Sequence, residues 1–190
     1  MSIQTQKLIY HLTCIDNLAS ILDRGIQPRS ALSGYVDIAD GEIIESRQKL
    51  GLENYVPFHF FGGNPFDGRV QKDHPEKEFV LITVRREHAS AQNWQIIPRH
   101  PLADEDIKLM DYAEGFSTID WAKMNERNYS DDHSKSVCMA ECLSPDVVLP
   151  ERFFSCYVAN SSNQKTVLES LNAAGYDKHV NINEGMFVKR

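Results

Sequence analysis

The sequence lacks a long apolar run, and it has no excess of positive charge. No segment approaches the roughly 20 consecutive apolar residues that cross a membrane, and residues 1–7 lack the apolar core of a signal peptide. The formal net charge of -7 argues against a protein that coats nucleic acid generally, because such affinity for phosphate comes from many Lys and Arg side chains. We therefore expect a cytoplasmic protein without a membrane partner, in which any basic groove is local.

Cysteine is scarce, and the cysteines are not spaced as metal ligands. The chain contains Cys14, Cys138, Cys142 and Cys156. No CxxC pair or Cys/His cluster has the spacing of a zinc site, so the apolar neighbours of these thiols predict buried free cysteines and no metal. Glycine-rich phosphate loops are also lacking, because Gly62-Gly63-Asn64 is too short and has no strand-turn-helix setting.

The composition suits one globular domain over residues 1–190. The chain has 190 residues with 42% hydrophobic and 25% charged content, and no repeat or low-complexity linker divides it. The apolar pattern predicts strands at 7–12, 55–61, 78–85, 94–97, 137–143 and 153–158, helices at 16–24, 43–50, 119–124 and 164–174, and a closing hairpin from 180–182 and 186–188. The fold class is therefore α+β, with a central mixed or antiparallel sheet flanked by helices.

Glu141 is the most conspicuous residue of the sequence. It lies in the apolar run 137–143, which Ser144-Pro145 closes, and this run has the length of a buried strand. An ionised carboxylate among apolar neighbours must be paired, satisfied or used in chemistry. Cys138 or Cys142 with His133 offers a weaker nucleophile hypothesis, since core thiols explain both cysteines more simply.

His11 and Thr13 form a second candidate site. They stand two positions apart at the end of a strand, so both side chains should project to one face. The structural alternative for His11 is a histidine that satisfies a backbone group, and Asn17 is explained equally well as a helix cap. Arg47, taken alone, is most simply a solvated helix charge.

Short motifs follow one another over about residues 8–150. They are Tyr10-His11-Leu12-Thr13, Ile15-Asp16-Asn17-Leu18, Arg47, Tyr55-Val56-Pro57-Phe58, and Met139-Ala140-Glu141 followed by Ser144-Pro145. In order and spacing they resemble the DarT family of DNA ADP-ribosyltransferases, and the joint pattern is far more specific than any single motif.

The resemblance implies an ADP-ribosyltransferase-like fold that uses NAD as co-substrate. His11 and Thr13 would bind NAD around its nicotinamide and ribose, and Asn17 would add a contact near the same pocket. Arg47 would hold the dinucleotide phosphates or the reacting centre, and Glu141 would be the catalytic carboxylate. Such a group either stabilises the oxocarbenium character of the ribose or removes a proton from the attacking base.

The resemblance also implies that the acceptor is thymine or guanine in single-stranded DNA. Residues 64–71 depart from the Arg-Ser-Pro-Met-Leu run of thymine-modifying members, and this favours guanine. An unpaired base could stack on Phe58, Phe60, Phe61 or Phe66 while Arg69 and Lys72 meet its phosphates, although core packing and solvation are equally simple explanations. By the same resemblance the protein would be a toxin, paired with an antitoxin that has ADP-ribosyl-hydrolase activity.

Two alternatives stay open at this point. The first is an ADP-ribosyltransferase that acts on RNA or protein, since an NAD site alone does not fix the acceptor. The second is a non-catalytic domain that binds NAD or nucleic acid and keeps the fold.

Overall fold

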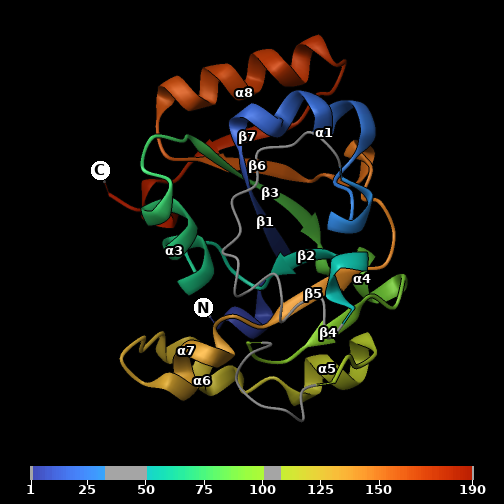
Figure 1. The fold of residues 1–190 in the computed structure, drawn as a ribbon, viewed down its shortest axis with the longest axis vertical. Helices are drawn as coiled ribbons and strands as arrows, with labels where there is room; N and C mark the ends of the chain where they lie inside the picture. The colour runs from blue at the N-terminus through green and yellow to red at the C-terminus, as the bar shows by residue number, and fades with distance from the viewer. Residues whose placement is uncertain (1, 33–50, 101–107, 190) are drawn as a thin grey trace.

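One seven-stranded sheet organises the molecule (Figure 1). The structure is a computed structural model that describes residues 2–32, 51–100 and 108–189. The strand order is β4-β5-β2-β1-β3-β6-β7, and every neighbouring pair is antiparallel except β6 and β7. The strands are β1 (Leu8–Cys14), β2 (Val56–His59), β3 (Phe79–Arg85), β4 (Gln95–Ile97), β5 (Glu141–Ser144), β6 (Ser155–Val158) and β7 (His179–Ile182). The predicted class, α+β with a mixed sheet, is confirmed.

Helices gather at the two ends of this sheet. Figure 1 shows α1 with α8 over the β6 end and α5 to α7 together near β4 and β5. The α-helices are α1 (Leu18–Arg24), α3 (Pro65–Asp73), α4 (Arg86–Ala91), α5 (Tyr112–Thr118), α6 (Trp121–Glu126), α7 (Asp132–Val137) and α8 (Ser161–Ala173). Short 3-10 helices span Ile3–Thr5, Ile15–Asn17, Arg29–Ala31, Leu52–Asn54, Pro150–Arg152 and Glu184–Met186.

Strand β3 is the centre of the core, as its continuous apolar run predicts. Its alternate residues enter two clusters, so that Val80 and Ile82 pack in the larger one and Phe79 and Leu81 in a second one on the other face. All four side chains are buried. At about 1.5–3 kcal/mol for each large apolar side chain removed from water, this strand contributes strongly to stability.

Local signals in the sequence fix where several helices begin and end. Asn64 caps α3, because its side-chain oxygen accepts from the backbone N–H of Asp67, and Pro65 follows at the first helical position. Gly25 ends α1 with a φ of 80°, and a Cβ there would lie 2.8 Å from the carbonyl oxygen of Val148. Glycine is therefore required at that position.

The prediction of one strand over residues 137–143 is wrong in its first half. Helix α7 runs to Val137, a turn follows, and Glu141 is the first residue of β5 instead of its middle. Asp131 caps α7 by accepting from the backbone N–H of His133. A buried helix end and a buried strand carry the same apolar residues, so the run could not separate them.

The C-terminal part of the sheet also differs from the prediction. The closing hairpin is wrong, because β7 pairs parallel with β6 and a 3-10 helix, Glu184–Met186, follows it. The 13 residues of α8 carry the chain back between the two strands, which a parallel pair requires.

Helix α3 was not predicted, since residues 65–73 have a weak apolar pattern. The predicted helix 43–50, which contains Arg47, lies outside the described residues.

The described residues can also be compared with the sequence for free cysteines, membrane-spanning helices and metal ligands. All four cysteines are buried and unbridged, as predicted. Residues 2–32, 51–100 and 108–189 contain no helix long and apolar enough to cross a membrane, and they hold no group of three or more potential metal ligands.

Candidate active site

The sheet opens between β1 and β2. These two strands pair at one position, Tyr10 with His59, whereas β1 and β3 pair along the whole of β1. In the opening, His11 Nδ1 lies 2.8 Å from the carbonyl oxygen of Pro57. Since a carbonyl can only accept, His11 donates from Nδ1, and its side chain bridges the two strands where their backbone pairing stops.

The neutral form of His11 dominates at physiological pH. Burial lowers the pKa of His11 to about 4; the bond to Pro57 opposes this shift, and the nearby His59 adds to it. With its proton on Nδ1, the neutral ring presents Nε2 as an acceptor. The bond to Pro57 also agrees with the structural alternative, in which His11 satisfies a backbone group.

Thr13 and Asn17 lie beside each other just after His11. Strand β1 places His11 and Thr13 on the same face, as predicted, and Thr13 is buried. The Asn17 amide Nδ2 donates to Thr13 Oγ1 at 3.4 Å. Asn17 occupies the N-cap position of α1, as the helix-cap interpretation predicts, but its side chain makes no capping hydrogen bond to that helix.

Glu141 stands on the other side of β2 from these residues. It pairs with His59 in β2 and with Ile97 in β4, and its exposed fraction is 6%. Residues opposite each other in a sheet share a face, so Glu141 shares a face with His59 and Tyr10. Alternation along β1 turns His11 to the other face. The structure therefore places the two sets on opposite sides of β2 and on opposite faces of the sheet.

His59 joins the two sets, although no motif in the sequence singles it out. It is buried, it pairs with Tyr10 and Glu141, and its charged form lowers the pKa of His11. Its Nδ1 lies 3.2 Å from the carbonyl oxygen of Ala140. The only signal in the sequence was its place directly after Tyr55-Val56-Pro57-Phe58, and strand pairing cannot be deduced from that.

Helix α3 covers this face next to His59. The Phe66 ring lies 5.3 Å from the His59 ring, centroid to centroid. Asp67 is buried and accepts from the backbone N–H of Gly63 at 2.9 Å. Burial is the main cause that raises the pKa of Asp67 to about 7, and its Oδ1 has no hydrogen-bond partner among the described residues.

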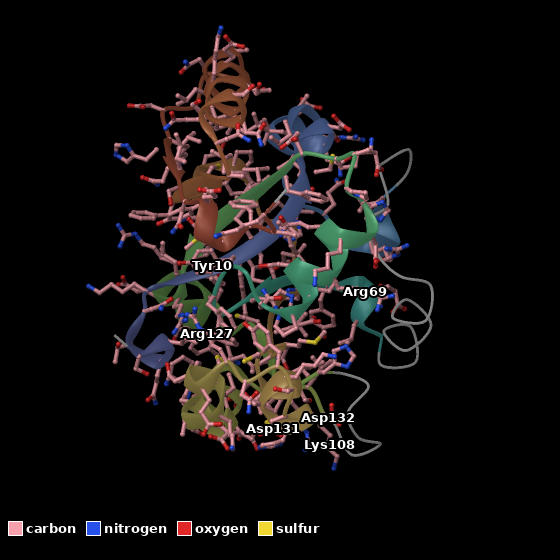
Figure 2. The ribbon with its side chains drawn as sticks, turned by 90° about the vertical axis from the view of Figure 1, so that its left-hand side faces the viewer. Tyr10, Arg69, Lys108, Arg127, Asp131 and Asp132 are labelled. Carbon is pink, nitrogen blue, oxygen red and sulfur yellow. The ribbon has the colours of Figure 1, made fainter. Side chains whose placement is uncertain are left out.

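Charged residues are unevenly distributed around the site. Arg69 and Lys72 are exposed on α3, and Arg69 pairs with Asp73. Figure 2 shows Arg69 on α3, well above Asp131 and Asp132 at the lower end of the molecule. Although the net charge of the chain is negative, these acidic residues of α7 therefore do not lie beside the exposed cations of α3. Arg47 lies outside the described residues, so the structure gives it no position relative to Glu141.

Several solved structures share this fold. A Thermus sp. 2.9 DarT in complex with ADP-ribosylated ssDNA matches with a TM-score of 0.83, 18% identity, and 96% of both chains covered. The same protein in complex with NAD+ matches at 0.79 and 16% identity, over 97% of this chain and 98% of that one. A Thermosipho africanus DarTG in complex with ADP-ribose matches at 0.72 and 22% identity, over 96% of this chain and 51% of that one. Among curated proteins, no sequence match is found.

The seven-stranded mixed sheet and its helices have the fold of these DarT structures. A sequence model of one family, described as "ssDNA thymidine ADP-ribosyltransferase, DarT", matches residues 10–188. The chain belongs to the DarT family. The predicted family and the predicted enzyme class, an NAD-dependent DNA ADP-ribosyltransferase, are thereby confirmed.

Proposed function

We propose that this protein transfers ADP-ribose from NAD to a base of single-stranded DNA. The bond between the ribose C1′ and the nicotinamide nitrogen breaks, and nicotinamide leaves with the electron pair. A bond from C1′ to the base forms, and the base loses one proton. The observation that carries the proposal is Glu141, a buried carboxylate fixed by strand pairing on both sides, in a chain of the DarT family.

Glu141 is the proposed catalytic residue. As the ribose loses nicotinamide it gains positive charge, and a carboxylate held on a rigid strand stabilises this charge without reorganising. The same group can accept the proton of the attacking base. Its exposed fraction of 6% means that little water screens its charge.

The proposed NAD contacts come from β1 and the 3-10 helix after it. His11 offers Nε2 as an acceptor for an amide or hydroxyl of NAD, because its Nδ1 proton is held by Pro57. Thr13 and Asn17 already bond to each other and form one polar unit beside it. Arg47 is proposed to hold the phosphates or the reacting centre, as the family resemblance implies. The Thermus DarT solved with NAD+ supports NAD as the co-substrate.

The proposal also includes the identity of the modified base. The family description names thymidine, whereas the departure at residues 64–71 favours guanine. These residues include the start of α3, and Phe66 there packs against His59, the strand partner of Glu141. The segment that differs therefore lies close to the proposed catalytic group, and we keep guanine as the expected base.

The biological role follows from the same family. We propose that the protein acts in the cytoplasm as a toxin and that an antitoxin with ADP-ribosyl-hydrolase activity removes the ADP-ribose. The Thermosipho protein, named DarTG and solved with ADP-ribose, supports such a pairing.

The test combines polymer choice with base identity. The protein is incubated with labelled NAD and single-stranded DNA, duplex DNA, RNA or bulk protein, and nucleosides from the labelled polymer are identified by mass. We expect label on single-stranded DNA and a guanine adduct. A thymine adduct would correct the base alone. Label on RNA or protein would overturn the DNA acceptor, and NAD binding without any transfer would favour a non-catalytic domain.

A further inference from the structure

His59 connects three parts of the structure that meet at Glu141. Its backbone pairs with Glu141 in β5, and its Nδ1 bonds to the carbonyl oxygen of Ala140 at 3.2 Å. Its ring packs against Phe66 of α3 with 5.3 Å between centroids. Because the side chain is buried, these contacts fix its orientation.

The bond to Ala140 acts directly on the backbone of Glu141. The carbonyl of Ala140 and the N–H of Glu141 belong to one planar peptide unit, so holding the oxygen also orients the nitrogen and Cα of Glu141. This peptide lies between the turn after α7 and the first residue of β5. Strand ends are the places where pairing is weakest, and a side-chain bond there restricts the motion of the residue that begins the strand.

We infer that His59 is a positioning residue that holds Glu141 in its reactive orientation through the Ala140 peptide. The inference rests on the proposed function, in which Glu141 is the catalytic group. The side chains of His59 and Glu141 share one face of the sheet, and their Cβ atoms are about 5 Å apart in such a pair. Phe66 packs against the His59 ring, so α3 contributes to the placement of Glu141.

Two substitutions distinguish the role of His59 Nδ1, which donates to Ala140, from that of Nε2. In His59→Asn, the amide nitrogen takes the place of Nδ1 and can still donate to Ala140. In His59→Gln, the amide nitrogen takes the place of Nε2, and the donor to Ala140 is lost. We expect H59Q to lower kcat about 100-fold, as displacements of about 1 Å do, with KM for NAD changed less than about 2-fold. H59N should keep kcat within about 3-fold of wild type, since the positioning bond survives.

A matched control comes from His179, which lies exposed on the edge strand β7. His179→Gln should change neither kcat nor KM. Wild-type kcat in H59Q, or equal losses in H59Q and H59N at unchanged Tm, would overturn the role of His59. If H59Q does not fold, Phe66→Leu is measured instead, by NAD consumption without DNA. A fall in kcat at unchanged KM supports the inference, and unchanged kcat overturns it.

The same assay separates this inference from the proposed function. Wild-type transfer together with an unaffected H59Q removes only the role of His59. No transfer by the wild-type protein to any polymer overturns the proposed function, and this inference is overturned with it.

Discussion

His11 donates from Nδ1 to the carbonyl oxygen of Pro57 at 2.8 Å, across the point where β1 and β2 stop pairing. A side-chain hydrogen bond thus connects the two strands where their backbone pairing ends. The bond leaves Nε2 of the neutral ring as an acceptor at the opening. One hydrogen bond therefore bridges the opening of the sheet and also sets the tautomer of the proposed NAD contact.

Glu141→Gln should abolish most of the transfer. The amide keeps the size of the side chain and removes its charge, so we expect kcat to fall about 100- to 1,000-fold with little change in Tm. Steady-state transfer of label from NAD to single-stranded DNA measures this. Glu151→Gln, in the exposed 3-10 helix Pro150–Arg152, is the control and should behave as wild type. Unchanged turnover in E141Q would remove Glu141 from catalysis.

His11→Ala should weaken NAD binding more than it weakens the fold. One lost hydrogen bond is worth about 0.5–1.5 kcal/mol, so the Kd for NAD should rise about 3- to 10-fold by calorimetry. His133→Ala, on the exposed surface of α7, is the control and should leave Kd unchanged. A large fall in Tm with normal NAD affinity would instead assign His11 a purely structural role.

The buried Asp67 should make stability fall as pH rises. Its pKa is about 7 in the folded protein, against an ordinary value of 3.8, so the folded state binds more protons than the unfolded state between these values. The stability that the protonated form contributes is complete below pH 3.8 and is lost as pH rises through about 7. The loss is up to about 4 kcal/mol.

Urea unfolding of wild type and Asp67→Asn between pH 4 and 8 measures this contribution. The amide oxygen in the variant still accepts from Gly63, and the side chain no longer titrates. The difference in free energy of unfolding should shift in favour of D67N as pH rises. A constant difference over this range would show that Asp67 has an ordinary pKa. Asp73→Asn, exposed on the same helix, is measured in parallel as the surface control.

Arg86→Leu should be strongly destabilising. The Arg86 side chain is buried, and it donates to the backbone carbonyls of Ile3, Gln4, Leu8 and Phe60. Its loss removes four hydrogen bonds, two of them buried, and leaves the buried carbonyl of Phe60 without this donor, so we expect the free energy of unfolding to fall by about 3 kcal/mol or more.

The neighbouring Arg85 provides the control for this substitution. Arg85 is exposed and stacks 4.1 Å from the centroid of the Phe154 ring, a contact worth about 0.5–1 kcal/mol. Arg85→Leu should therefore cost about 1 kcal/mol or less in urea unfolding. Equal losses for the two variants would contradict the anchoring role of Arg86.

The local structure around Glu141 could be predicted only in part from the sequence. The apolar run 137–143 predicted burial correctly, yet it could not show that the run is shared between the end of α7 and the start of β5. Helix α3 escaped prediction because its buried positions include the polar residues Asp67 and Gln71 beside Val70, which breaks the apolar pattern. The parallel pairing of β7 depends on how α8 returns the chain, which is a long-range property.

The sequence by itself determined most of the buried strands, the C-terminal end of α1, the free cysteines and the motif order that indicates the family. These depend on local chemistry, namely apolar periodicity, a glycine at positive φ and the spacing of short motifs. Only the tertiary structure decided that β1 and β2 part after Tyr10 and His59, and that Glu141 lies beside His59 instead of on the face of His11. Register and strand order arise from contacts between residues far apart in the chain, and no local pattern encodes them.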